Sequence, residues 1–133
     1  MKILFATSEA LPFAMSGGLA DVSGALPKAL RRRLVGGRVV MPLYSSISPE
    51  LREKMTFIAN ITVSVSWRRQ YCGIFEAHAD GVIYYFIDNE YYFKRDTLYG
   101  YYDDAERYAF FARAVLEIIP YIGFTPDIIH CND

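Results

Sequence analysis

The sequence predicts an α/β fold in which a mainly parallel sheet carries an antiparallel excursion. Short, uninterrupted apolar runs, which are typical of strands buried on both faces, occur at residues 2–7, 38–43, 82–87 and 127–131. Amphipathic helical spacing separates some of these runs, over residues 19–33 and 103–119. Alternation of apolar and mostly polar residues at 56–66 indicates an antiparallel strand. A chain of 133 residues fits one domain with one core.

The first half of the chain has the order strand, loop, helix, strand. Residues 2–7 predict a buried strand, and the polar, glycine-bearing stretch after them predicts a loop. Residues 19–33 predict a helix with cations in its later turns, where they suit the helix dipole. Pro27 lies inside that pattern and is expected to bend the helix or remove one backbone hydrogen bond, with a kink near Ser23. Residues 38–43 then predict a second strand, reached by a right-handed crossover.

The middle of the chain predicts the antiparallel excursion and a functional loop. Residues 56–66 and 72–78 are the two strand candidates of the excursion. Residues 82–87 predict the return to the main sheet, because this apolar run is again continuous. Residues 88–102 form an aromatic and charged loop, and loops of that length are usually functional.

The last part predicts a helix and an edge strand. Asp103 and Asp104 are expected to cap a helix that Pro120 stops. Its expected apolar stripe consists of Tyr108, Phe111, Ala112, Val115, Leu116 and Ile119. Residues 127–131 predict the final strand, and no helix follows to cover its far side. We therefore expect an uncovered sheet edge through which the chain could self-associate.

Composition excludes several classes of protein. Fourteen Lys and Arg against fifteen Asp and Glu give a net charge of −1, so no global field favours nucleic acid or an anionic membrane. No apolar run approaches the length of a membrane span. Cys72 and Cys131 have no metal-ligand spacing, and we interpret them as reduced core residues of a cytoplasmic protein. Eleven Tyr and nine Phe exceed what a small core hides, so part of this aromatic surface is expected to contact a ligand or another domain.

A double glycine, Gly17-Gly18, stands between the first strand and the first helix, after Ser16. Glycines there could bring backbone N–H groups close to a phosphate. The pair alone is a weak signal, because neither the P-loop pattern nor the dinucleotide-binding pattern is present. A glycine pair in such a turn more often serves tight geometry than a ligand.

Longer segments carry a more specific signal. The string Gly-Gly-Leu-Ala-Asp-Val-Ser-Gly-Ala-Leu-Pro-Lys-Ala-Leu at 17–30 is the most specific. It is accompanied by segments 8–9, 39–44, 84–88, 98–100, 103–111 and 127–133. Together they resemble the bacterial and plant glycogen and starch synthases over nearly the whole chain.

This resemblance implies a retaining glucosyltransferase built from two Rossmann-like domains. Such an enzyme moves glucose from ADP-glucose to the non-reducing end of an α-1,4-glucan without a metal cofactor. Residues 1–133 match only the opening of the first domain, a partial N-terminal catalytic domain. The resemblance places most donor contacts and the catalytic carboxylates in the second domain, so we expect no catalytic residue here and no activity from this chain alone.

The resemblance also implies substrate-binding residues. Ser16, Gly17 and Gly18 correspond to the turn that receives the nucleotide-sugar phosphates. Asp21 corresponds to an acidic residue near the sugar or acceptor, and it could instead only complement the helix dipole. Tyr99 corresponds to a tyrosine facing the cleft, where its ring could pack on a glucose; packing within its own loop is equally open.

Three further residues lie near strand ends. Asp133 corresponds to a family residue lining the sugar site, at the edge of the sheet where α/β folds bind ligands. His130 is interpreted as a core histidine. Glu9 could bond to a ligand or could be a buried loop carboxylate that holds backbone N–H groups.

One departure from the family pattern bears on function. Met15 stands where the family has a lysine, so the cation that would neutralise the donor phosphates is absent from that position. This favours an alternative reading, a non-catalytic half-domain that binds glucan, a nucleotide or a full-length synthase. An unrelated nucleotide-binding protein is a third reading that the length of the match disfavours.

Overall fold

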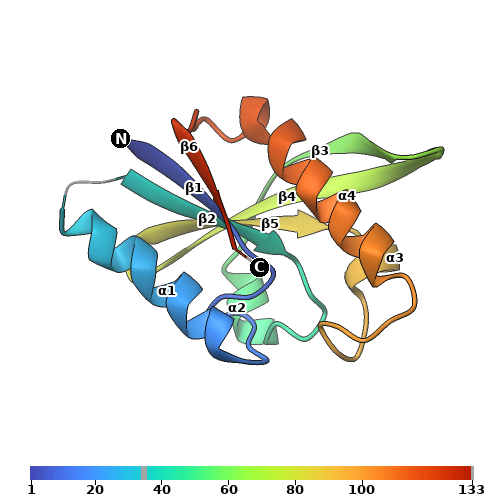
Figure 1. Ribbon diagram of the computed structural model, residues 1–133, viewed down its shortest axis with the longest axis horizontal. Coiled ribbons are helices and arrows are strands. Elements are labelled where there is room, and N and C mark those ends of the chain that lie inside the picture. Colours follow the sequence, from blue (N-terminus) through green and yellow to red (C-terminus); the bar gives the residue numbers. More distant parts are fainter. Residues whose placement is uncertain (34–35, 133) are drawn as a thin grey trace.

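The computed structural model describes residues 1–33 and 36–132. One six-stranded sheet, in the order β3-β4-β5-β2-β1-β6, forms its centre (Figure 1). The strands are β1 (Lys2–Ala6), β2 (Gly36–Pro42), β3 (Thr56–Val65), β4 (Arg68–Ala79), β5 (Val82–Asp88) and β6 (Ile128–Cys131). The helices are α1 (Gly18–Arg31), α2 (Pro49–Glu53), α3 (Glu90–Phe93), α4 (Asp104–Glu117) and the 3₁₀ helix η1 (Ile119–Tyr121).

The sheet is parallel on one side and antiparallel on the other. β1 pairs in parallel with β2 and β6, and β2 pairs in parallel with β5. β4 runs antiparallel to both β3 and β5, so the β3–β4 hairpin is an excursion at one edge. The predicted α/β class, the antiparallel excursion and the return to the main sheet are confirmed, and the arrangement is Rossmann-like.

The two long helices cover opposite faces of the sheet. Tyr84 and Tyr85 are consecutive on β5, so their side chains point to opposite faces. The Tyr84 hydroxyl donates to the Leu11 carbonyl, in the segment before α1, and the Tyr85 hydroxyl donates to the Ile122 carbonyl, just after α4 and η1. The segments next to α1 and to α4 therefore lie on opposite faces, as Figure 1 shows for the helices themselves.

The core lies on both faces of the central strands β2 and β5. Their buried residues are Val39, Val40, Met41, Val82, Tyr84, Tyr85, Phe86 and Ile87. Burial on both faces is the reason these strands have continuous apolar runs rather than alternation. Transfer of such surface from water is the main contribution to the stability of the fold.

Helix α1 is one unbroken helix although Pro27 lies inside it. It begins at Gly18 and ends at Arg31, close to the predicted range. Pro27 is buried, and its Cβ lies 3.8 Å from the place where a Cβ on Gly37 would be. That is an ordinary van der Waals distance, whereas the same Cβ would lie 2.9 Å from Cε2 of Phe5, so the glycine in β2 makes room for the Phe5 ring.

Helix α4 buries a side that overlaps the predicted stripe at Phe111 and Val115 but not at Ala112 and Leu116. The buried residues are Arg107, Phe110, Phe111, Ala114, Val115 and Ile118. Ala112 and Leu116, which the prediction placed in the core, are exposed, and Leu116 retains 58% of its accessible surface. The prediction is wrong for these two residues because α4 has two adjacent apolar sides, and only one of them packs against the sheet.

Other boundaries and placements also differ from expectation. β4 begins at Arg68, so the β3–β4 turn is tighter than predicted. Cys72 is buried, whereas Cys131 and His130, both expected in the core, are exposed. Both lie on β6, which within residues 1–33 and 36–132 pairs with β1 alone, so its other edge and part of its faces are open there.

The short helices α2 and α3 were not predicted, because helices of five and four residues are too short to show a helical repeat of apolar positions. In α2 the Ser48 side chain accepts from the Leu51 N–H, and in α3 the Asn89 side chain accepts from the Tyr92 N–H. In the part of the chain that the structure describes, no helix is long and apolar enough to cross a membrane.

Candidate functional site

The loop between β1 and α1 is organised around the carboxylate of Glu9, which is only 2% exposed. Its Oε1 accepts the backbone N–H groups of Gly17 at 3.1 Å, Ala20 at 3.3 Å and Ser16 at 3.4 Å. Its Oε2 accepts the Ser16 hydroxyl at 2.6 Å. The reading of Glu9 as a buried carboxylate that holds backbone N–H groups is confirmed.

These bonds keep Glu9 ionised. Burial by itself raises the pKa of a carboxyl group, because the charged form loses its hydration. Hydrogen bonds from the Ser16 hydroxyl, the Tyr99 hydroxyl and the N–H groups of Ser16 and Gly17 outweigh burial, and the pKa of Glu9 is below its ordinary value. Glu9 is therefore a buried anion at the N-terminus of α1, where the helix dipole also favours negative charge.

The carboxylate leaves part of this helix terminus open. Gly17, the N-cap residue of α1, has no side chain to cap the helix. Gly18 and Leu19 have backbone N–H groups without a hydrogen-bond partner among residues 1–33 and 36–132. A Cβ placed on Gly17 or Gly18 would meet nothing within 4 Å. Two free donors therefore face a region with room for a ligand.

Tyr99 comes from the loop after α3 and reaches the same carboxylate. Its hydroxyl donates to Glu9 Oε2 at 2.7 Å and lies 2.6 Å from the Ser8 hydroxyl. Because the single phenolic proton goes to Glu9, the Ser8 hydroxyl is the donor in the second bond. Burial, and after it the bond to Glu9, raise the pKa of Tyr99, so its proton stays in place. The hydroxyl of Tyr99 is therefore used in bonds within the protein, while its ring remains partly exposed.

The loop that carries Tyr99 is fixed by Arg107, whose side chain is fully buried. Its Nε donates to the Tyr92 carbonyl at 2.6 Å, and its Nη1 donates to the Leu98 carbonyl at 2.9 Å and to Asp104 Oδ1 at 2.8 Å. The Tyr108 hydroxyl also donates to the Leu98 carbonyl, at 2.7 Å. Helix α4 thereby holds the backbone of α3, before the loop, and the backbone of Leu98, next to Tyr99.

Asp103 and Asp104 hold the same loop instead of capping α4 as expected. Asp103 is the N-cap residue, but its side chain makes no cap hydrogen bond. Both of its oxygens accept from the Arg95 guanidinium, at 3.1 and 2.9 Å, and that bond lowers the pKa of Asp103. Asp104 Oδ2 accepts the Gly100 N–H at 2.8 Å. The capping prediction is wrong because partners from the loop compete successfully for both carboxylates.

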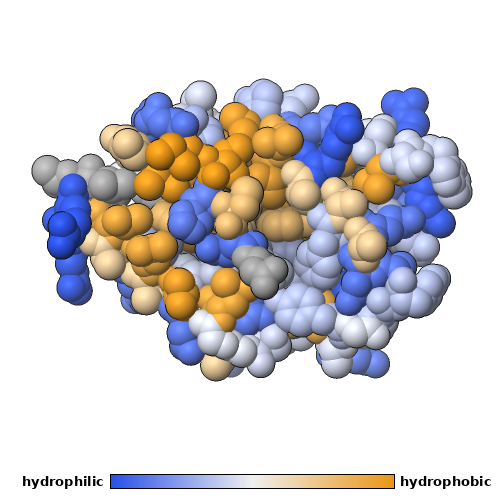
Figure 2. Space-filling view, viewed as in Figure 1, coloured by the Kyte–Doolittle hydropathy of each residue, from blue (hydrophilic) through white to orange (hydrophobic). Residues whose placement is uncertain are grey.

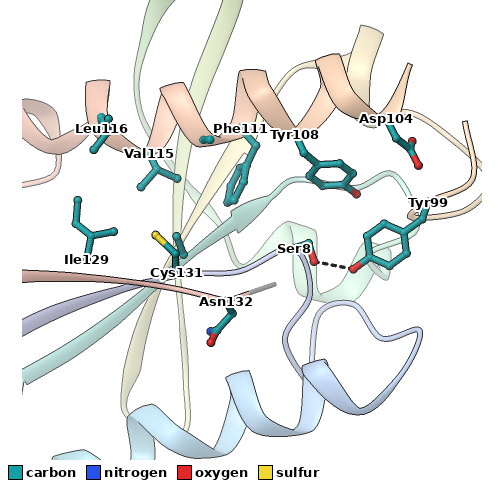
Figure 3. Close-up of a pocket in the computed structure, with 12 residues that line it drawn as sticks. Ser8, Tyr99, Asp104, Tyr108, Phe111, Val115, Leu116, Ile129, Cys131 and Asn132 are labelled. Atoms are coloured by element: carbon teal, nitrogen blue, oxygen red, sulfur yellow. Dashed lines mark hydrogen bonds between the residues drawn. The ribbon is translucent and has the colours of Figure 1, made fainter. Parts of the chain in front are cut away.

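Two hollows meet at Ser8 and Tyr99. The glycine-loop hollow, of about 350 Å³, is lined by Ser8, Glu9, Ser16, Gly17, Gly18, Leu19 and Tyr99. The α4–β6 groove, of about 580 Å³, is lined by Ala6, Ser8, Tyr99, Asp104, Tyr108, Phe111, Ala112, Val115, Leu116, Ile129, Cys131 and Asn132. Figure 3 shows apolar side chains of α4 facing Ile129 and Cys131 of β6, with the Ser8–Tyr99 bond at one end of the groove.

The structure brings together most of the predicted binding residues. Ser16, Gly17, Gly18 and Tyr99 all line the glycine-loop hollow. Asp21 lies exposed in the first turn of α1 and does not line either hollow within the described residues, so its two readings remain open.

Two other positions bear on the predicted site. Asp133, predicted to line the sugar site, lies outside the residues that the structure describes. Met15, beside the hollow in sequence, has a side chain 56% exposed.

Sequence reasoning left Glu9 open between a ligand contact and a loop carboxylate, and it gave Ser8 no role in the site. The available signal was an acidic residue directly after a buried strand and before the glycine pair. Nothing local indicated Tyr44, whose hydroxyl donates to the Ser8 carbonyl at 2.7 Å. Among the described residues, no group of three or more His, Cys, Asp or Glu is placed to hold a metal ion.

Comparison with known proteins gives a family for this arrangement. A family model described as the starch synthase catalytic domain matches residues 2–133. This chain belongs to the starch synthase catalytic-domain family. The confirmed resemblance includes the glycine string from which it was first inferred.

Curated relatives of this family member are named glycogen synthases. Those of Geobacillus thermodenitrificans and Geobacillus stearothermophilus are each 64% identical over 133 residues, which is all of this chain and 27% of theirs. The glycogen synthase of Caldicellulosiruptor bescii is 61% identical over the whole chain and 28% of its own length. The chain thus spans about a quarter of the length of the relatives it matches.

A solved structure shows the same fold. The catalytic domain of starch synthase IV from Arabidopsis thaliana, bound to ADP and acarbose, aligns with a TM-score of 0.87 at 29% identity. The alignment covers 99% of this chain and 27% of that one. The six-stranded sheet is therefore the opening part of a starch synthase fold.

Proposed function

We propose that this chain forms the first part of the catalytic domain of an enzyme that transfers glucose from ADP-glucose to the non-reducing end of an α-1,4-glucan. The observation that carries the proposal is the glycine-loop hollow, in which the Gly18 and Leu19 N–H groups, at the N-terminus of α1, have no partner within the described part of the chain. Oxygens of a diphosphate accept such N–H groups, and the helix dipole favours their charge. The open space at Gly17 and Gly18 leaves room for the phosphates to approach.

The remaining groups of the reaction are proposed to come from elsewhere in the polypeptide or enzyme. The family resemblance assigns the catalytic carboxylates to a second domain and requires no metal cofactor. Within this chain we propose Asp21 and Asp133 as contacts to sugar or acceptor and the Tyr99 ring as a surface for a glucose unit. Two free cysteines, Cys72 and Cys131, support a cytoplasmic location.

Similarity to the Arabidopsis starch synthase supports this proposal, since that structure holds ADP, the group that ADP-glucose would release. The test is a chimera in which this chain replaces the matching segment of the Geobacillus stearothermophilus glycogen synthase. We expect protein-dependent incorporation of labelled glucose from ADP-glucose into glycogen. The 133-residue chain alone, assayed beside it, is expected to be inactive, because this chain spans only 27% of that relative.

The alternative function is a non-catalytic half-domain that binds glucan, a nucleotide or a full-length synthase. The neutral, exposed Met15 favours it, because no cation is supplied at that position. An inactive, correctly folded chimera that still binds ADP or glycogen would support this alternative over transfer. An active chimera would exclude it.

A further inference from the structure

The N-terminus of α1 is shared between an internal anion and an open hollow. Glu9 accepts the N–H of the N-cap residue Gly17 and that of Ala20 in the first turn. The two N–H groups between them, of Gly18 and Leu19, have no partner among the described residues. A carboxylate from the preceding loop thus satisfies the outer donors of the turn and leaves the inner pair free.

We propose that Glu9 is a positioning residue for the donor diphosphate, holding the Ser16–Gly18 turn so that the Gly18 and Leu19 N–H groups stay available to the hollow. This inference rests on the proposed function. Glu9 acts through the backbone of the turn, and its own negative charge is directed into the protein by five hydrogen bonds.

The absence of a side-chain cap at Gly17 is part of the argument. A serine or threonine N-cap would accept the N–H of the second or third residue of the helix. The second residue of α1 is Leu19, whose N–H is one of the two free donors. By taking the capping role from outside the helix, Glu9 stabilises α1 without occupying that donor.

The second oxygen of Glu9 links this turn to the other side of the site. Oε2 accepts both the Ser16 hydroxyl and the Tyr99 hydroxyl, at 2.6 and 2.7 Å. Tyr99 lies in the loop that Arg107 and Tyr108 fix to α4 through the Leu98 carbonyl. Removing the carboxylate therefore breaks the link between the glycine turn and the loop that α4 holds.

Glutamine is the sharpest substitution because it keeps the shape of Glu9. Its amide has one acceptor oxygen and one NH₂ donor, so it can accept from the N–H groups of the turn or from the two hydroxyls, but not from both. In the chimera we expect E9Q to raise the KM for ADP-glucose about tenfold or more, the scale of a lost hydrogen bond to a charged group. The KM for glycogen should stay within about twofold, since the turn serves the donor.

Further variants separate positioning from general loss of structure. Y99F removes only one of the five bonds to Glu9 and is expected to raise the KM for ADP-glucose by a few-fold. E53Q on α2 and Y102F, which change exposed side chains away from the hollow, serve as matched controls and should leave both KM values unchanged. E9D keeps the charge and is expected to recover part of the loss.

Two measurements decide the outcome. If E9Q raises both KM values equally, or lowers kcat alone, Glu9 does not position the donor site and the inference is overturned. Amide hydrogen exchange of the same chimera gives the second readout, in which E9Q should speed exchange at residues 16, 17 and 20. Unchanged exchange there would equally overturn it.

The proposed function and this inference fail in different ways. A folded wild-type chimera without transfer activity contradicts the proposed function. In that case calorimetric titration with ADP still tests Glu9, because the diphosphate of ADP is the group to be received. Equal ADP affinity of wild type and E9Q would then contradict the inference, whereas weaker affinity of E9Q would support it.

Discussion

At the scale of single residues, buried polar side chains fix the conformation of the loops by hydrogen-bonding to their backbone groups. Glu9 holds the turn before α1, and Arg107 holds the loop after α3. A buried charge is costly unless its hydrogen bonds are made. Each of these residues makes several, mostly to backbone groups, and thereby fixes a segment that has no regular secondary structure.

Arg107 is the residue on which we expect stability to depend most. R107M keeps the length of the side chain but removes the donors to the Tyr92 and Leu98 carbonyls and the pairing with Asp104. The free energy of unfolding should fall by about 3 kcal/mol, because buried acceptors lose their partners. R113M, which removes an exposed partner of Glu117, should cost less than about 0.5 kcal/mol. Urea unfolding of both variants is the measurement, and equal effects would contradict the assignment.

Acid should destabilise the protein through carboxylates that accept hydrogen bonds in the folded state. Folding lowers the pKa of Glu9 and of Asp103, so each contributes stability above its unfolded pKa and loses it as the pH falls through the folded pKa. Since unfolded carboxyls titrate near about 4, the free energy of unfolding should be level from pH 7 to about 5 and then decline. E9Q should be less stable at pH 7 and decline less steeply. A parallel decline of E9Q and wild type in urea titrations would show that Glu9 is not involved.

Met15 stands at the position where the family resemblance implies a lysine. In the chimera, M15K should tighten ADP-glucose binding by up to about fivefold, the scale of an exposed ion pair, because the side chain is 56% exposed. Glucose binding should not change, since the added cation addresses the diphosphate. Calorimetric titration with both ligands tests this, with M15L as the neutral control. A gain for glucose as large as that for ADP-glucose would mean that position 15 does not face the phosphates.

At the scale of elements, Gly18 and Gly24 of α1 have different structural roles. Gly18 faces open space, whereas a Cβ on Gly24 would lie 3.0 Å from the Leu11 carbonyl oxygen. The first glycine keeps the hollow clear at the start of the helix. The second allows the preceding loop to pack closely against the helix.

Alanine substitutions should therefore shift stability in opposite directions. G18A should stabilise the protein by up to about 1 kcal/mol, because alanine loses less backbone entropy in a helix. G24A should destabilise it by about 1 kcal/mol or more, because backbone of the loop must move. Thermal and urea unfolding of the two variants test the contrast. Stabilisation by both would show that the Leu11 segment yields easily.

At the scale of the whole molecule, the side of α4 that the sheet leaves free forms one wall of the α4–β6 groove. Figure 2 shows hydrophobic residues gathered in the region where β6 and the neighbouring part of α4 lie in Figure 1. Leu116 and Ile128 are among the exposed large apolar residues. Beside them lies the outer edge of β6, which pairs with no other strand of the described residues. Exposed apolar surface next to a free edge favours association.

The isolated 133-residue chain should consequently form oligomers that light scattering detects at micromolar concentration. L116D places a charge in the groove and should shift the population toward monomer, whereas K54D, a change of charge on an exposed residue after α2, should not. A monodisperse wild-type monomer whose melting does not depend on concentration would contradict this expectation.

The sequence by itself determined the strands, the two long helices and the α/β class, because continuous apolar runs and helical periods are local properties of the chain. It also located the glycine turn that lines the hollow. Only the tertiary structure decided which side of α4 is buried, that Glu9 fills half of the α1 terminus, and that Tyr99 donates to it. Glu9 and Tyr99 are 90 residues apart, and α4 carries apolar residues on two sides. A contact between distant segments, or a choice between two similar faces, depends on how the elements pack, and no local pattern encodes it.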